Sequence, residues 1–124
     1  MVTKVSDGII ETNVIGADTT KNLTVGHTTD VEILGSNTIT PDMATESLKK
    51  RAVNGNVTIN FPTNGNSVCH IRLEADSGGA YTVTLGANVN PVGTIPDLSA
   101  STDYLAVISR FDATTADIQI QEIG

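Results

Sequence analysis

The sequence is poor in aromatic side chains and contains a single cysteine. Aromatic residues make up 3% of the 124 residues and tryptophan is absent, so aliphatic side chains must build the core. One cysteine, Cys69, excludes a disulfide within the chain. This argues against a small secreted scaffold held together by several disulfides.

Cations and long apolar runs are also scarce. The chain has 7 Lys and Arg residues against 14 Asp and Glu residues, which gives a net charge of −7. Because affinity for phosphate backbones depends on Lys and Arg, we expect no nucleic-acid partner. No apolar run approaches the roughly 20 residues that span a bilayer, and the first ten residues do not resemble a signal peptide. We therefore expect that the protein is made in a cytoplasm and does not associate with a membrane.

The sequence is rich in β-branched residues. Val and Ile occur 12 times each and Thr occurs 18 times, while 11 Gly and 10 Asn are available for turns. Such residues pack well on a pleated surface. The composition predicts an all-β protein, and the length fits one domain.

Strand patterns are regular from Asp30 onward. In "DVEIL", Val31 and Ile33 alternate with Glu32, and clearer strands are predicted within residues 56–61, 67–75, 80–85, 103–111 and 116–123. The turn at 76–79 predicts a hairpin between 67–75 and 80–85. Residues 103–111 are almost continuously apolar, as expected when both faces are covered. We predict an antiparallel, jelly-roll-like β-sandwich over residues 29–124.

Residues 40–55 are the one helical candidate. Thr40 could cap a short helix and Pro41 suits its first position. Lys49, Lys50 and Arg51 would then lie in the last turn, where cations complement the helix dipole. The competing interpretation is an irregular loop, and the basic triplet could also be a docking patch for an acidic partner.

Residues 1–28 differ from the rest because their apolar residues come in ones and twos. We interpret them as an extended arm that lies against a neighbouring subunit or a partner, since ordering such a segment alone costs about 1–2 kcal/mol per residue. The alternative is a first strand of the same domain. The expected contact residues of the arm are Val2, Val5, Ile9, Ile10, Val14, Ile15, Leu23 and Val25.

No arrangement of residues predicts catalysis. Adjacent strand residues point to opposite faces, so His70 cannot act as a base for Cys69, which is in register with core positions. His27, Asp30 and Glu32 would project in different directions rather than converge on a metal. There is no phosphate-binding loop and no nucleophile elbow. We expect no enzyme activity, cofactor, metal or small-molecule substrate.

One stretch resembles a β-module of virion proteins from tailed bacteriophages. The matching pieces are Phe61-Pro62, "IRLEADSGG", "YTVTLG", Gly93 with Pro96, and "STDYLAVISRF", within residues 30–124. The resemblance implies a virion structural protein made in the host cytoplasm. It would be either a head decoration (cement) protein on the capsid surface or a tail fibre, tail tip or head fibre module.

The sequence departs from that family pattern in lacking an aromatic residue after "TVTL" and another in the last strand. Aromatic poverty argues against receptor recognition, where Tyr and Trp anchors are favoured. A receptor-binding fibre also normally carries a long shaft, which 124 residues do not accommodate. The expectation is therefore a decoration protein that binds the major capsid protein and self-associates, as a homotrimer.

Overall fold

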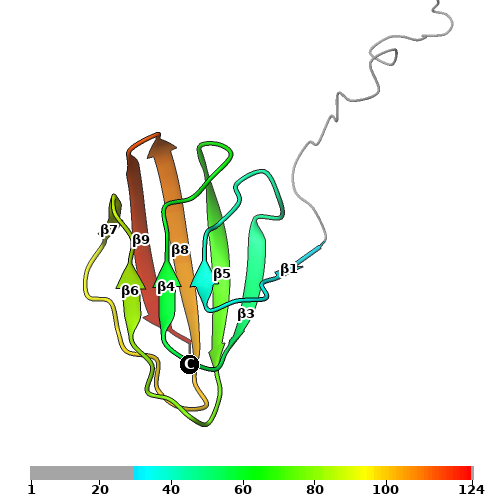
Figure 1. Ribbon diagram of the computed structural model, residues 1–124, viewed down its shortest axis with the longest axis vertical. Coiled ribbons are helices and arrows are strands. Elements are labelled where there is room, and N and C mark those ends of the chain that lie inside the picture. The colour runs from blue at the N-terminus through cyan, green and yellow to red at the C-terminus, as the bar shows by residue number, and fades with distance from the viewer. Residues whose placement is uncertain (1–29, 124) are drawn as a thin grey trace, which may run out of the picture.

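The structure is a computed structural model in which residues 30–123 are described, and these residues are all-β, as predicted (Figure 1). No helix that could cross a membrane occurs among them. The nine strands are β1 (Glu32–Ile33), β2 (Thr38–Ile39), β3 (Leu48–Val53), β4 (Val57–Ile59), β5 (Ser67–Ala75), β6 (Val83–Leu85), β7 (Val89–Pro91), β8 (Asp103–Asp112) and β9 (Thr115–Glu122).

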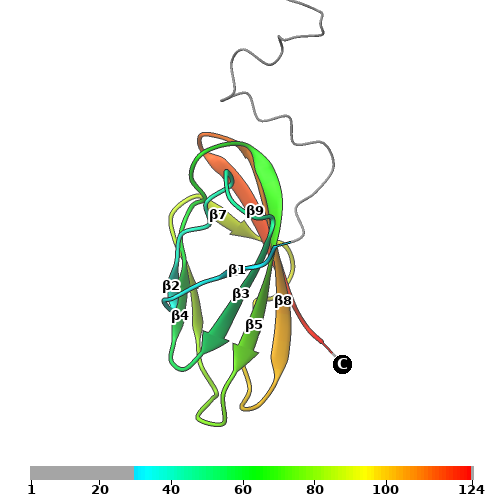
Figure 2. The ribbon, with the colours of Figure 1, turned by 90° about the vertical axis from the view of Figure 1, so that its right-hand side faces the viewer.

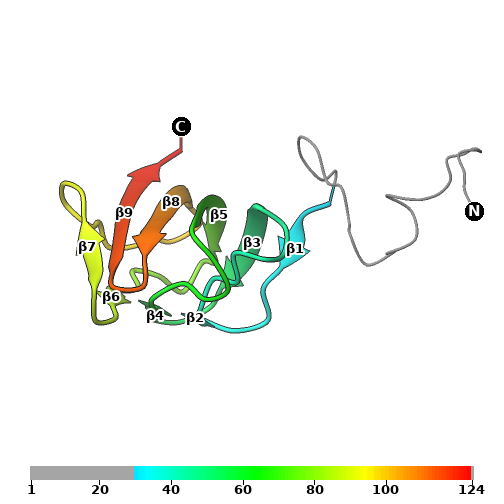
Figure 3. The same cartoon turned by 90° about the horizontal axis from the view of Figure 1, so that it is seen from above.

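The strands form two sheets that lie face to face (Figure 2). One sheet has six strands in the order β1-β3-β5-β8-β9-β7, and the other has three in the order β2-β4-β6. Figure 3 shows the six-stranded sheet as the wider layer. Aliphatic side chains from both sheets, such as Ile59, Ile71 and Ile118, are fully buried and form a single core.

Between β1 and β6 the chain changes sheet with every strand, so its path is a spiral. This spiral of β1 to β6 is here called the coil. Strands β1, β3 and β5 are parallel neighbours in the large sheet, and β2, β4 and β6 are parallel neighbours in the small one. Each strand of one sheet thereby supplies the crossover that two parallel strands of the other sheet require. The turns of this coil differ in length, since Glu32 pairs with Lys49 and Lys49 pairs with Ile71.

The last two strands form an antiparallel hairpin that extends the large sheet. Strand β8 pairs with both β5 and β9, and the facing pairs Ala106–Ile120 and Ile108–Ile118 are buried. At the hairpin turn, Asp112 Oδ1 accepts a hydrogen bond from the backbone N–H of Thr114 at 2.9 Å. On the far edge, β7 pairs in parallel with β9.

The predicted antiparallel topology is therefore wrong, because the six-stranded sheet is mixed and the three-stranded sheet is parallel. The predicted hairpin over 67–75 and 80–85 is also wrong, since β5 and β6 lie in different sheets. The turn that follows β5 carries the chain across instead of back. Asp76 Oδ1 accepts hydrogen bonds there from the Gly78 N–H and the Tyr81 hydroxyl. A Cβ at Gly79 would lie 2.8 Å from the carbonyl oxygen of Leu98, which explains the glycine.

The helix predicted for residues 40–55 is absent, and a turn followed by β3 takes its place. The strand forms because β3 pairs with β5 along its whole length, and the predicted helix had only a thin apolar face to bury. Burial along β5 and β9 alternates as predicted, with Cys69, Ile71 and Leu73 inward. In β8 only one face is buried, so the expectation that both faces are covered is wrong.

Candidate interaction surface

The basic triplet lies in strand β3, where alternation sends its members to opposite faces. Lys49 points inward and is buried. Its ammonium nitrogen lies 2.7 Å from Glu32 Oε1, 2.8 Å from Thr45 Oγ1, and 2.7 and 3.0 Å from the carbonyl oxygens of Glu46 and Asp42. The hydrogen bond from Lys49, followed by that from Thr45, lowers the pKa of Glu32 from its usual value of 4.5. Lys49 therefore holds the 42–46 turn against β1.

Arg51 also has an internal role. Its side chain is half-buried and donates hydrogen bonds to Asn37 Oδ1 at 2.9 Å and to the Leu34 carbonyl oxygen at 3.2 Å. These bonds fix the connection between β1 and β2. Lys50, between the two, is the exposed member of the triplet. The expectation that all three cations share the last turn of a helix is wrong, and their role in partner binding stays a prediction.

The side of the six-stranded sheet that faces away from the three-stranded sheet, here called the outer face, exposes several aliphatic side chains. Val31 is 45% exposed, Ile33 70% and Leu48 48%. The sequence predicts only that Val31 and Ile33 alternate with Glu32, and alternating aliphatic residues normally mark a buried face. Val31 and Ile33 turn outward because Glu32, which alternates with them, reaches the buried ammonium of Lys49.

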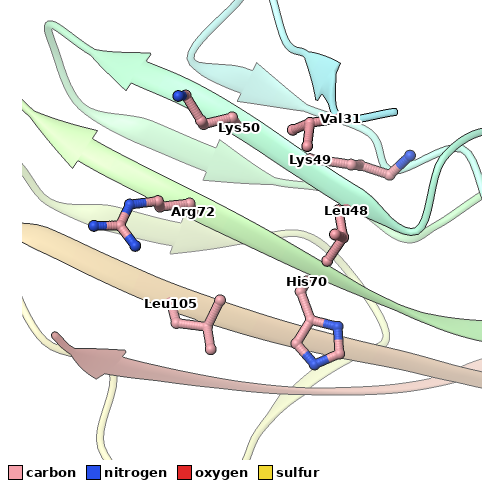
Figure 4. Close-up of a pocket in the computed structure, with 7 residues that line it drawn as sticks. All are labelled: Val31, Leu48, Lys49, Lys50, His70, Arg72 and Leu105. Atoms are coloured by element: carbon pink, nitrogen blue, oxygen red, sulfur yellow. The ribbon is translucent and has the colours of Figure 1, made fainter. Parts of the chain in front are cut away.

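The outer face contains a groove of about 230 Å³ that extends from Val31, just before β1, across β3, β5 and β8. Figure 4 shows its lining side chains: Val31, Leu48, Lys49, Lys50, His70, Arg72 and Leu105. Most of the exposed lining is apolar, and the polar side chains among the lining residues are those of Lys49, Lys50, His70 and Arg72. The groove thus combines an aliphatic floor with positive charge on a protein of net charge −7.

The two exposed cations of the groove differ in their partners. Arg72 pairs with Asp103 at 2.8 Å and with Glu74 at 3.3 Å, and the hydrogen bond that it donates to Asp103 is the main reason that its pKa is raised. Within residues 30–123, Lys50 has no ion pair. No carboxylate of this part of the chain therefore competes for Lys50 with one brought by a partner.

A second hollow, of about 340 Å³, lies near the β8–β9 turn. It is lined by Asn66, Ser67, Val68, Ser109, Arg110 and Phe111, and Phe111 is 62% exposed. Arg110 does not project freely, because its guanidinium lies 5.2 Å from the centroid of the Phe61 ring and donates to the Pro62 carbonyl oxygen. This hollow adds apolar area to the surface, and its one cation is held by a carbonyl oxygen and an aromatic ring.

Cys69 and His70, which are adjacent in β5, do not form a nucleophile–base pair. Burial raises the pKa of the Cys69 thiol to about 11, which is the opposite of what activates a nucleophile. His70 lies on the outer face, on the other side of the sheet from Cys69, as the strand pattern predicted. No group of His, Cys, Asp and Glu side chains that could hold a metal occurs within residues 30–123.

The arm residues predicted to contact a partner lie outside the described residues, namely Val2, Val5, Ile9, Ile10, Val14, Ile15, Leu23 and Val25. The groove itself was missed from the sequence. The sequence does show that Val31, Ile33 and Leu48 are aliphatic. That their side chains point outward follows only from the inward position of Lys49.

The comparisons with protein-family models, with curated proteins and with solved structures found no match to this chain. The candidate surface therefore rests on the geometry of the chain itself.

Proposed function

We propose that this protein is a structural component of a bacteriophage virion, a head decoration protein with a β-sandwich body. It would bind the major capsid protein and associate with its own copies as a homotrimer. The observation that carries this proposal is the outer face, where Val31, Leu48 and Leu105 form an aliphatic groove beside Lys50 and Arg72. The resemblance of residues 30–124 to phage virion modules supports it.

The mechanism would be mechanical. An exposed aliphatic surface gains about 25 cal/mol for each Å² of apolar area removed from water. A protein that binds only the assembled shell stabilises that shell by mass action, by about 2.7 kcal/mol for each site at 100 times the dissociation constant. Weak contacts become effective when one molecule engages several subunits at once.

The test is binding to purified phage heads that lack the protein. We expect the wild-type chain to bind in hundreds of copies and to raise the temperature at which heads rupture. Leu48→Asp should reduce occupancy more than tenfold, because it replaces apolar contact area with a carboxylate whose removal from water costs about 2 kcal/mol or more. Thr84→Asp, at an exposed position of β6 in the other sheet, is the matched control.

Two outcomes would contradict the proposal. Equal occupancy of Leu48→Asp and Thr84→Asp would remove the groove from the binding surface. A wild-type protein that occurs in few copies per particle and binds host cells would instead be a fibre or tail module.

A further inference from the structure

We propose that the groove on the outer face binds residues 5–15 of a second copy of this chain. The inference deepens the self-association part of the proposed function and rests on it. It assigns the surface through which copies join and the segment that occupies it. Three observations carry it: the chemistry of the groove, the spacing of its side chains and the place where the described chain begins.

The chemistry of the segment complements that of the groove. Residues 5–15, "VSDGIIETNVI", contain five aliphatic residues and two carboxylates, Asp7 and Glu11, and no cation. The groove offers an aliphatic floor with Lys50, which has no ion pair within residues 30–123, beside it. On a chain of net charge −7, a cationic apolar groove selects an acidic apolar occupant.

The spacing matches as well. In an extended segment, residues two apart lie on one side and are separated by about 6.6–6.8 Å. Ile9 therefore has Asp7 and Glu11 on the same side at that distance. Leu48 and Lys50 are also two residues apart on one strand, and the register places Lys50 beside Arg72. With Ile9 against Leu48, one of the two carboxylates lies beside Lys50.

The choice of a second copy over the same one rests on the proposed self-association and on the reach of the chain. Val31 lines the groove beside the edge strand β1, so residues 1–29 join the described part of the molecule next to the groove. The 29 preceding residues can extend up to about 95 Å, several times the width of a six-stranded sheet.

The experiment is disulfide crosslinking between full-length variants, with no phage heads present. A size-tagged Ile9→Cys chain is mixed with an untagged Leu48→Cys chain and mildly oxidised. We expect the tagged–untagged product to form at least about fivefold more than with Thr84→Cys, because docking raises the effective concentration of the two thiols. Cys69 is buried with a raised pKa and stays out of the reaction.

A charge exchange provides the second measurement. Lys50→Glu should lower the crosslinking yield about threefold, as expected for an exposed ion pair, and Asp7→Lys with Glu11→Lys should restore it. If Leu48→Cys does not fold, Lys50→Cys takes its place in the crosslinking.

Equal yields with Leu48→Cys and Thr84→Cys would overturn the inference. So would a crosslink that forms only within one chain of an Ile9→Cys/Leu48→Cys double variant. Because heads are absent from this experiment, the two failures can be told apart. A chain that decorates heads without forming the crosslink would overturn this inference alone, and a chain that forms the crosslink without decorating heads would overturn the capsid role alone.

Discussion

The coil from β1 to β6 and the hairpin of β8 and β9 use the same residue types but hold their shape differently. Four of the six strands in the coil have 2 or 3 residues, whereas the hairpin strands have 10 and 8. A long antiparallel ladder satisfies most of its backbone groups by itself. The short strands of the coil cannot, and side chains complete the bonding there.

Those side chains join consecutive turns of the coil. Lys49 binds Glu32 and the 42–46 turn, and Arg51 binds the connection between β1 and β2. The Asn60 side-chain amide donates to Thr40 Oγ1 at 3.1 Å between two other turns. In the hairpin, by contrast, paired aliphatic residues dominate. We therefore expect substitutions of polar side chains to affect the stability of the coil more than that of the hairpin. Substitutions in the shared core should affect both regions alike.

The largest effect should come from the core, which both regions share. Ile59 of the coil and Ile108 of the hairpin are both fully buried. Changing either to Ala should cost about 2–5 kcal/mol, and because the core is continuous, each variant should still unfold in one transition. Denaturant unfolding monitored by circular dichroism measures this, with Ile33→Ala on the surface as a control that changes stability by less than about 0.5 kcal/mol. Separate transitions for coil and hairpin would show two folding units.

The next effect should be confined to the coil. Lys49→Met removes a buried ammonium, takes the donor from the carbonyl oxygen of Glu46 and leaves that of Asp42 with its bonds from Thr45 alone, which should cost about 3 kcal/mol. Lys50→Met, one position along the same strand, should cost less than about 0.5 kcal/mol because Lys50 is exposed. The free energies of unfolding of the two variants provide the comparison. Similar values would mean that Lys49 is not what holds the 42–46 turn.

The sequence predicts the secondary structure of the later strands well and the topology poorly. Alternation in residues 67–75 and 116–121 identified both the strands and their inward faces, because a half-buried strand leaves a period of two. Topology leaves no such trace here. The coil has turns of unequal length, so no fixed repeat appears, and the short connections between strands look like hairpin turns although they cross between sheets.

The groove could be predicted only in part. The aliphatic nature of Val31, Ile33 and Leu48 is visible in the sequence, but such residues normally indicate a buried face. What reverses them is a cation, Lys49, which occupies the inward position opposite Glu32. A buried lysine in the middle of "LKKR" cannot be distinguished from its exposed neighbour until the pairing of β3 with β5 is known.

The smallest effect should be the response to acid, which tests the two regions through one carboxylate each. The pKa of Glu32 in the coil is lowered mainly by Lys49, and the pKa of Asp112 in the hairpin turn is lowered mainly by the Thr114 N–H. A lowered folded-state pKa contributes stability above the unfolded value, which is lost as the pH falls through the folded value. Stability should therefore decline below about pH 4.5, and Glu32→Gln and Asp112→Asn should each flatten that decline. Urea midpoints between about pH 6 and pH 2.5 measure the slopes. Because Glu32 has a buried ammonium as its partner and Asp112 only dipoles, Glu32→Gln should flatten the curve more, and the reverse order would place the stronger electrostatic contribution in the hairpin.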